Sequence, residues 1–235
     1  ELTRLAQMDR TLFALATDSR GSVTLGDFAA LLPGQFIECG IAEQDAVGMA
    51  AGLANAGLRP FVCGPACFYS MRSAEQIKVD VAYSRTNVKI IGVSGGVSYG
   101  ALGSTHHSTQ DVALMRAIPD MEVYLPADAV QMRFLTNYLA KSPKPAYVRM
   151  GRGPVPEIYS PGTGFTPGRA VLLRSGADAS IIACGETVHH ALRAAELLAR
   201  DGIDASVYDM FTIKPLDREA IIEAAATGFV VTVEE

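Results

Sequence analysis

The sequence predicts an α/β protein with two doubly wound domains on mainly parallel sheets, and three observations support this. Short apolar runs alternate with longer amphipathic or alanine-rich runs along the 235 residues. Most short runs are rich in Val and Ile without polar alternation, which is typical of strands covered on both faces. A Gly- and Pro-rich stretch at 151–168 separates two such series. Each series is therefore expected to form its own sheet with right-handed crossovers.

The strands are expected where Val- and Ile-rich runs lie between turn-forming or polar residues, at 59–63, 88–93, 122–125, 146–150, 180–184, 205–208 and 229–233. The helices are expected between them, at 43–56, 71–84, 129–141, 187–200 and 217–226. The run 187–200 places its apolar side chains on one stripe. Gly57 and Gly202 stand where helix C-caps would lie.

The chain is expected to comprise a domain at 1–152, a linker at 153–168 and a second domain at 169–235. The last run, 228–235, reads as a core strand with no helix after it. An α/β domain that stops on such a strand is expected to be incomplete, so the second domain is interpreted as truncated.

Composition favours a cytoplasmic globular protein and argues against two classes of partner. Hydrophobic residues make up 49% of the chain, which is ample for a core, and the net charge is -5. Lys and Arg form no stripe, which argues against nucleic acid and anionic membrane. No apolar run approaches the ~20 residues that span a bilayer. The cysteines are expected to be reduced, buried thiols and not metal ligands; they are Cys39, Cys63, Cys67 and Cys184.

Glu43 is the first candidate functional residue. It stands where the strand-like run from Phe36 gives way to a helix-like run of small residues, the junction at which open α/β sheets place their chemistry. From this segment alone, a favourable charge near a helix N-terminus and a functional acid are equally open readings. Gly48 and Gly52 in the same helix are interpreted as positions of tight core packing.

A second candidate is the Gly- and Ser-rich stretch at 94–111, which follows the strand at 88–93 and ends near His106 and His107. Loops at the carboxyl ends of parallel strands commonly bind ligands. Two adjacent histidines could bond or exchange protons with a ligand, although the residues alone favour one exposed and one packed histidine. The pair in the helix at 187–200, His189 and His190, is interpreted as structural.

Arginines and aromatics follow other strand ends. Arg149, at the end of the strand at 146–150, suits a phosphate or carboxylate, whereas Arg152 is read as a solvated arginine at the domain boundary. Arg20 is a weaker case of the same kind. Phe68 and Tyr69 follow the strand at 59–63 and are expected to form an exposed pair in a loop, where they could stack on a flat heterocycle.

Several motifs, in a shared order, make the chain resemble the transketolase family of thiamine-diphosphate enzymes from about Thr17 onward. The motifs are Gly40-Ile-Ala-Glu43-Gln, Gly103-Ser-Thr-His106-His107, Met115-Arg-Ala-Ile-Pro-Asp-Met, Pro126-Ala-Asp128 and Thr212-Ile-Lys-Pro-Leu-Asp217. The resemblance implies a pyrimidine-binding domain at 1–152 followed by part of the family's C-terminal domain. The family's diphosphate-binding motif, Gly-Asp-Gly followed by Asn, is absent from this sequence.

The resemblance also implies roles for the candidate residues. Glu43 would bond a ring nitrogen of the cofactor's aminopyrimidine and favour its imino tautomer, and Phe68 and Tyr69 would line that ring. Substrate contacts would come from His106, His107, Arg149, Ser94 and Arg20. Mg2+ and its ligands would belong to a separate N-terminal subunit or domain that binds the diphosphate.

The implied activity is transfer of a two-carbon ketol unit from a ketose, or ketose phosphate, to an aldose through a thiamine-diphosphate carbanion. It would require the diphosphate-binding partner and a second copy of the chain, in a dimer or heterotetramer. Leu102 stands where the family carries an aspartate, and Ser94 where many members carry a histidine. The substrate is therefore expected to be a less common ketose or a less hydroxylated donor. The alternatives are a 2-oxo acid dehydrogenase β-type subunit, a deoxyxylulose-phosphate-synthase-like enzyme and a non-catalytic assembly subunit.

Overall fold

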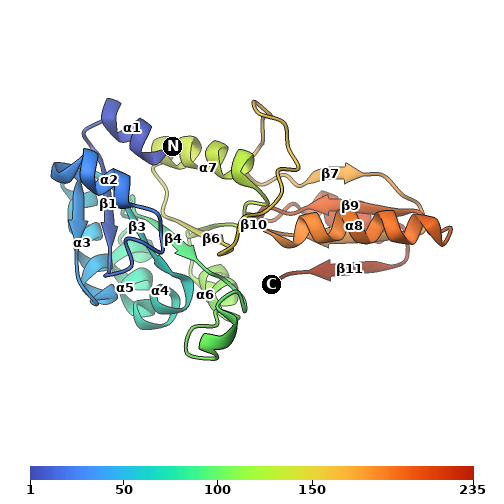
Figure 1. The fold of residues 1–235 in the computed structure, drawn as a ribbon, viewed down its shortest axis with the longest axis horizontal. Helices are drawn as coiled ribbons and strands as arrows, with labels where there is room; N and C mark the ends of the chain where they lie inside the picture. Colours follow the sequence, from blue (N-terminus) through green and yellow to red (C-terminus); the bar gives the residue numbers. More distant parts are fainter. The chain divides into compact units, whose positions relative to one another are not determined.

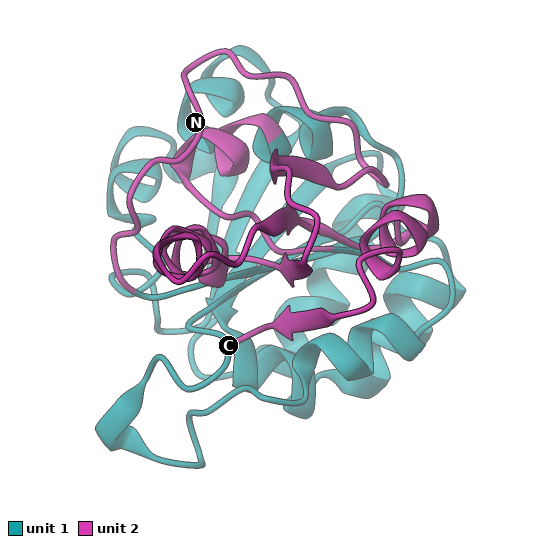
Figure 2. Ribbon diagram, turned by 90° about the vertical axis from the view of Figure 1, so that its right-hand side faces the viewer, with its two compact units in different colours: residues 1–123, 135–152 teal, residues 124–134, 153–235 magenta.

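The computed structural model describes residues 1–235, which divide into two compact units (Figure 2). Unit 1 consists of residues 1–123 and 135–152, and unit 2 consists of residues 124–134 and 153–235. Both units contain strands and helices, and most strand pairs are parallel. The predicted α/β class with mainly parallel sheets is therefore confirmed.

Six strands of the larger sheet lie in the order β5-β6-β4-β3-β1-β2. Figure 1 labels β6, β4, β3 and β1 among them. Their bounds are β1 (Leu12–Ala16), β2 (Phe36–Glu38), β3 (Arg59–Pro65), β4 (Lys89–Val93), β5 (Glu122–Tyr124) and β6 (Ala146–Met150). The pairs β2–β1, β1–β3, β3–β4 and β4–β6 are parallel. The carboxyl ends of these five strands therefore meet at one edge of the sheet, where α/β proteins bind ligands.

The helices of unit 1 pack on this sheet, and α3 and α4 both contact β3. The elements are α1 (Leu2–Met8), α2 (Gly26–Leu31), α3 (Glu43–Asn55), α4 (Ala66–Arg72), α5 (Ala74–Gln76), η2 (Ile77–Tyr83) and α6 (Asp111–Ala117), with short 3-10 turns η1 (Pro33–Gln35) and η3 (Gly100–Leu102). Helix α7 (Ala129–Lys141) contributes residues to both units. Gly57 ends α3 with a φ of 87°, which confirms the predicted C-cap.

The single helix predicted at 71–84 is wrong in its bounds and its form. Helix α4 begins five residues earlier, at Ala66, directly after β3. It ends at Arg72, and the chain continues through α5 into a π-helical turn at Ile77–Tyr83. Apolar periodicity did not reveal this start, because the first turn of α4 carries apolar residues all round and resembles a continuation of the strand.

Unit 2 has a four-stranded sheet in the order β11-β8-β9-β7, with β7 antiparallel at one edge. Its elements are β7 (Val171–Arg174), β8 (Ala179–Ala183), α8 (Thr187–Arg200), β9 (Ala205–Asp209), β10 (Thr212–Lys214), α9 (Arg218–Ala225) and β11 (Val230–Val233). Helix α8 has the predicted bounds, and Gly202 follows it with a φ of 80°, as expected of a C-cap. Part of the core joins β9 to α9 through Tyr208, Met210, Ala220 and Ala224.

The Gly- and Pro-rich stretch after β6 packs within unit 2. The Oδ2 atom of Asp128 accepts hydrogen bonds from the backbone N–H groups of Ile158 and Tyr159, both at 2.9 Å. The rings of Tyr159 and Phe165 are buried and meet edge to face, with centroids 4.7 Å apart. This stretch is therefore anchored by side chains despite a composition typical of linkers.

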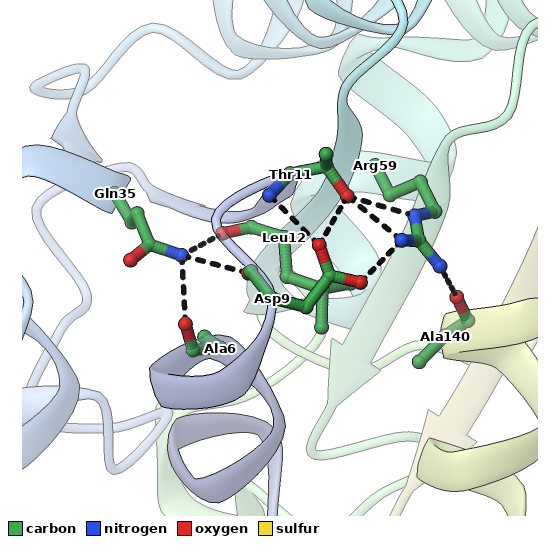
Figure 3. Close-up of polar contacts among 7 residues, drawn as sticks. All are labelled: Ala6, Asp9, Thr11, Leu12, Gln35, Arg59 and Ala140. Atoms are coloured by element: carbon green, nitrogen blue, oxygen red, sulfur yellow. Dashed lines mark hydrogen bonds and ion pairs between the residues drawn. The ribbon is translucent and has the colours of Figure 1, made fainter.

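A polar network ties the N-terminal helix to the sheet (Figure 3). The side-chain amide of Gln35 donates to the carbonyl oxygens of Ala6, Asp9 and Leu12 at 3.1, 3.2 and 2.8 Å. Arg59, the first residue of β3, bonds the Thr11 hydroxyl at 2.8–3.0 Å, pairs with Asp9 and donates to a carbonyl at the end of α7. These contacts hold the amino end of the sheet, opposite the edge that carries the candidate residues.

Candidate functional site

Glu43 is the first residue of α3 and is almost fully buried, with only 4% of its surface exposed. Four residues before Glu43, the N–H of Cys39 donates to the carbonyl oxygen of Ala16, which continues the pairing of β1 and β2 by one residue. Its Oε1 atom accepts a hydrogen bond from Nη1 of Arg72 at 3.0 Å. Burial with a specific cationic partner at a sheet edge is the setting in which carboxylates do chemistry.

Phe68 and Arg72 lie one helical turn apart on α4 and therefore share a face of that helix. The guanidinium carbon of Arg72 lies 4.1 Å from the centre of the Phe68 ring. Close approach of α4 to β3 depends on Gly64, because a Cβ at that position would lie 2.3 Å from the buried ring of Tyr69. Glycine in β3 thus fixes where α4 presents Phe68 and Arg72.

The loop after β4 is folded back on itself. Gly96 and Ser108 exchange backbone hydrogen bonds of 3.0 and 2.7 Å, which close the loop at its base. Ser94 begins the loop with a φ of 59°, a backbone conformation that non-glycine residues adopt rarely and mostly at functional turns. Within the closed loop, the Nε2 atom of His107 lies 3.1 Å from the carbonyl oxygen of Gly100.

His106 connects this loop to α4. Its ring meets the rings of Phe68 and Tyr99 edge to face, with centroids 5.2 Å apart in both cases. Its Nδ1 atom lies 2.9 Å from the hydroxyl of Thr105. The guanidinium carbon of Arg152, just beyond β6, lies 4.5 Å from the centre of the Tyr99 ring.

These contacts join residues that follow β2, β3, β4 and β6 into one continuous group, which we call the site row. The site row consists of Glu43, Arg72, Phe68, His106, Tyr99 and Arg152, in order of contact. Two arginines flank three aromatic rings along it, and the row runs from the buried acid Glu43 to the exposed Arg152. Such a row can hold a flat heteroaromatic group at one end and an anionic group at the other.

Tyr69 was expected to form an exposed loop pair with Phe68, and this is wrong. Both residues lie on α4, and Tyr69 is fully buried, with its hydroxyl 3.2 Å from that of Thr17. Neighbouring helical residues point about 100° apart, so only one of the two can face the site row. Phe68 is the one that does.

The arginines in and just after β6, Arg149 and Arg152, lie opposite to expectation, because the first is buried and the second belongs to the site row. Arg149 is 4% exposed and forms a 3.5 Å ion pair with the fully buried Asp111. A Cβ at position 95 would lie 2.0 Å from its Nε atom, so glycine there makes room for it. Arg152, read from the sequence as merely solvated, is exposed but stacks on Tyr99 in the site row.

Other predicted site residues lie outside the site row. Ser94 is buried at the base of the loop, and His107 is held by Gly100. Arg20 is exposed, with its guanidinium carbon 5.9 Å from the centre of the Phe36 ring. His189 and His190 lie on α8 in unit 2, as expected of structural residues.

The thiols near the site are poor nucleophiles. All four cysteines are free; Cys63, Cys67 and Cys184 are buried as expected, whereas Cys39 is only partly buried. Burial raises the pKa of the Cys67 thiol, next to Phe68, and raises the pKa of Cys63 to about 12. Burial and the nearby Glu38 carboxylate raise the pKa of Cys39 to about 11. The reactive thiolate form is therefore scarce at neutral pH, and nucleophilic catalysis by cysteine is disfavoured.

The glycines of α3 do not pack as expected. Added Cβ atoms at Gly48 and Gly52 would meet nothing within 4 Å, so the interpretation of tight core packing is wrong. Gly48 instead lines an open pocket of ≈ 460 Å³ with Gln44, Asp45, Met49, Gln76 and Asp80. One turn and more beyond Glu43, the two glycines therefore leave open space on the surface of α3.

Sequence reasoning missed Arg72 and Tyr99. Their signal was spacing, since Arg72 follows Phe68 by four residues and Tyr99 lies within the loop already singled out.

No three His, Cys, Asp or Glu side chains gather as a metal-binding group in the chain. None of its helices combines the length and apolar composition needed to cross a membrane.

Comparison with known proteins gives two family matches that together cover most of the chain. Residues 1–157 match the family model described as "Transketolase, pyrimidine binding domain", and residues 168–235 match "Transketolase, C-terminal domain". The chain is 58% identical over its full length to one subunit of the apulose-4-phosphate transketolase of Phocaeicola vulgatus, and covers 76% of that protein.

Two further relatives are similar along nearly the whole chain. The 6-deoxy-6-sulfo-D-fructose transketolase subunit SqwH of a Clostridium species is 41% identical over 99% of this chain, which covers 73% of that protein. A solved structure described as "Split gene transketolase, inactive beta4 tetramer" is similar over all of this chain and 76% of its own, with 41% identity and a TM-score of 0.90.

Proposed function

The chain belongs to the transketolase family, and on that premise we propose that it is the pyrimidine-binding subunit of a split, thiamine-diphosphate-dependent transketolase. Residues 1–152 would form the pyrimidine-binding domain, 153–168 a linker and 169–235 part of the C-terminal domain. The observation that carries the proposal is the arrangement of Glu43, Arg72 and Phe68 at the carboxyl edge of the sheet.

The residues of the site row fit the aminopyrimidine of this cofactor. Glu43 offers a buried carboxylate, and Phe68 offers an aromatic face beside it. The flat guanidinium of Arg72 touches both, so the space between them suits a flat, nitrogen-bearing group. In the imino tautomer, the protonated ring nitrogen would donate to the carboxylate in place of Arg72, and stacking on Phe68 would replace the cation–π contact.

The bound cofactor supplies a nucleophilic carbon and holds the electron pair released by C–C cleavage. Glu43 holds a proton between its carboxylate and the pyrimidine nitrogen and so sets the tautomer of the ring. Burial of Glu43 keeps water from competing for that hydrogen bond. General acid–base groups contribute about 10²- to 10⁴-fold to rates, so this single contact is expected to dominate turnover.

The other end of the site row is proposed to bind the sugar. Thr105 engages Nδ1 of His106, which leaves Nε2 to contact substrate oxygens. Arg149 was the expected phosphate ligand, but its burial against Asp111 argues against that role. Arg152 is better placed, because it is exposed and held over Tyr99, and a guanidinium fork suits a phosphate.

The site is proposed to be completed by other subunits. Near Glu43, Gly48 and Gly52 leave open space along α3, and the side chains of Met49 and Ile41 are exposed. Glycine inside a helix lowers stability relative to alanine, so the presence of two glycines in α3 needs an explanation. A close contact with another subunit at these positions would explain it. The similar split-gene transketolase is described as an inactive beta4 tetramer, which supports a requirement for the diphosphate-binding subunit and its Mg2+.

The substrate is proposed to be a ketose phosphate outside the common sugars. Leu102, in the place of the family's usual aspartate, is 53% exposed on the loop that carries His106. An apolar side chain there removes a hydrogen bond to a substrate hydroxyl. The relative at 58% identity is named for apulose 4-phosphate, so that compound is the first donor to test.

The test is donor consumption by the chain assembled with its diphosphate-binding subunit, thiamine diphosphate and Mg2+. Apulose 4-phosphate, a common ketose phosphate and pyruvate are offered separately with an aldose phosphate acceptor. Consumption of a ketose phosphate with two-carbon transfer supports the proposal. Consumption of pyruvate alone identifies a dehydrogenase-type or synthase-type enzyme instead, and no turnover with cofactor bound would indicate an assembly subunit.

A further inference from the structure

Arg72 makes two contacts with one guanidinium group. Its Nη1 atom donates to Oε1 of Glu43 at 3.0 Å, and its central carbon lies 4.1 Å from the centre of the Phe68 ring. The arginine reaches both from α4, one turn after Phe68. These are the two groups that the proposed function assigns to the aminopyrimidine of the cofactor.

The guanidinium resembles that heterocycle in the features that matter for binding. Both are flat, both stack on aromatic rings, and both can donate an N–H to a carboxylate oxygen, the heterocycle through its ring nitrogen in the imino tautomer. The proposed function places such a ring on the face of Phe68 and at the Oε1 atom of Glu43 that the guanidinium occupies. Arg72 and the aminopyrimidine therefore cannot make these contacts at the same time.

We infer that Arg72 is a displaceable placeholder, which occupies the pyrimidine position in the free chain and swings out when the cofactor binds. This inference rests on the proposed function. The need for a placeholder follows from Glu43, because a carboxylate with 4% exposure is costly to leave unpaired. Arg72 neutralises it until a ligand does so.

Displacement is feasible because the two partners differ in exposure. The Arg72 side chain is 48% exposed, so its long stem can rotate into solvent without opening the fold. Ion pairs with one well-solvated partner are weak compared with fully buried ones. The opposing possibility is that Arg72 stays in place and positions Glu43 for the cofactor, and the two possibilities predict opposite changes in affinity.

The test compares Arg72→Met with Arg85→Met. Methionine keeps an unbranched stem but removes the cation, and Arg85 forms an exposed 3.6 Å pair with Asp120 as a matched control. Thiamine diphosphate is titrated by calorimetry, with Mg2+, into the chain assembled with its diphosphate-binding subunit. Removing a competing group should tighten apparent binding by about three- to tenfold, whereas Arg85→Met should leave it unchanged.

A second readout is thermal unfolding of the same complexes with and without cofactor. Arg72→Met should lower the midpoint only in the cofactor-free form, because Glu43 regains a partner when the ring binds. Weaker or unchanged cofactor binding in Arg72→Met, or an equal loss of stability in both forms, overturns the placeholder while leaving the proposed function intact. Failure of the wild-type complex to bind thiamine diphosphate overturns both.

Discussion

Glu43 and Arg72 form a hydrogen-bonded ion pair of 3.0 Å in which the acid is buried and the arginine is half exposed. The acid stands at the first residue of a helix, on a sheet edge where four strand ends contribute to one row of contacts. A partner that can leave makes the carboxylate available to a ligand without unfolding any element. This arrangement, and the network that supports it, can be tested residue by residue.

Glu43→Ala is expected to lower turnover of the assembled complex by at least about 10²-fold, because the group that sets the pyrimidine tautomer is lost. Folding should persist, since the released Arg72 can turn to solvent. Steady-state kinetics and far-UV circular dichroism check the two parts. Glu219→Ala is the matched control, because Glu219 also lies in the first turn of a helix and pairs with an arginine, Arg169. Turnover within tenfold of wild type in Glu43→Ala would contradict the assignment.

Phe68→Leu is expected to weaken cofactor binding, whereas Tyr69→Phe is expected to lower folding stability. Loss of the Phe68 ring removes a stacking contact of about 0.5–1.5 kcal/mol, so cofactor affinity should fall roughly two- to tenfold. Tyr69→Phe leaves the buried Thr17 hydroxyl without its 3.2 Å partner and should cost about 1–3 kcal/mol of stability without changing that affinity. Calorimetric titration and urea unfolding measure the two effects; the reverse pattern would show that Tyr69 faces the cofactor.

Gly52→Ala and Gly57→Ala are expected to change the stability of the chain in opposite directions. Position 52 is helical with open space around it, so alanine should stabilise the isolated chain by about 0.5–1 kcal/mol. Position 57 has a φ of 87°, where a side chain is strained, so alanine should destabilise it. If the face of α3 contacts another subunit, Gly52→Leu should also weaken assembly in sedimentation velocity, and unaltered assembly would argue against that contact.

Asp209 is expected to make unfolding depend on pH. It is buried, its Oδ2 atom accepts from Gln131 at 2.8 Å and Tyr159 at 2.6 Å, and its Oδ1 atom has no protein partner. Burial raises its pKa to about 7, above the ordinary value of 3.8, so the folded state holds a proton that the unfolded state releases. The contribution of the protonated Asp209 to the free energy of unfolding is complete below about pH 4 and is lost as the pH rises to about 7.

The measurement is the free energy of unfolding in urea between pH 5 and 8, compared between wild type and Asp209→Asn. The difference between the two proteins should change by about 1.4 kcal/mol per pH unit below pH 7 and level off above it. Asp201→Asn, at an exposed position after α8, serves as the control. A constant difference across this range would show that Asp209 stays ionised.

Arg59→Met is expected to destabilise unit 1 without altering the site. The guanidinium bonds Thr11, pairs with Asp9 and donates to the carbonyl of Ala140 at the amino end of the sheet (Figure 3). Losing this network should cost about 1–3 kcal/mol in urea unfolding. Cofactor affinity should stay the same, because the candidate residues lie at the other edge. Arg85→Met should cost much less, since its ion pair is exposed.

The sequence by itself determined the fold class and the strand ends at which the site lies. Apolar runs and helical stripes are local properties, so β6, α7 and α8 have the predicted bounds, and Gly57 and Gly202 cap helices as expected. The elements β1, β10 and α6 were missed, since their short runs carry little periodicity of their own. Glu43 and His106 could be identified because they follow strands of one parallel sheet.

Only the tertiary structure decided which neighbouring side chains face that edge. Phe68 and Tyr69 differ by one residue, and the start of α4 at Ala66 turns the first toward His106 and the second into the core. Arg149 and Arg152 separate in the same way, because Arg149 lies in β6 and pairs with the buried Asp111, whereas Arg152 lies beyond the strand and contacts Tyr99. The placement of Arg72 between Glu43 and Phe68 depends on how closely α4 packs on Gly64, which is a property of three-dimensional packing and not of local pattern.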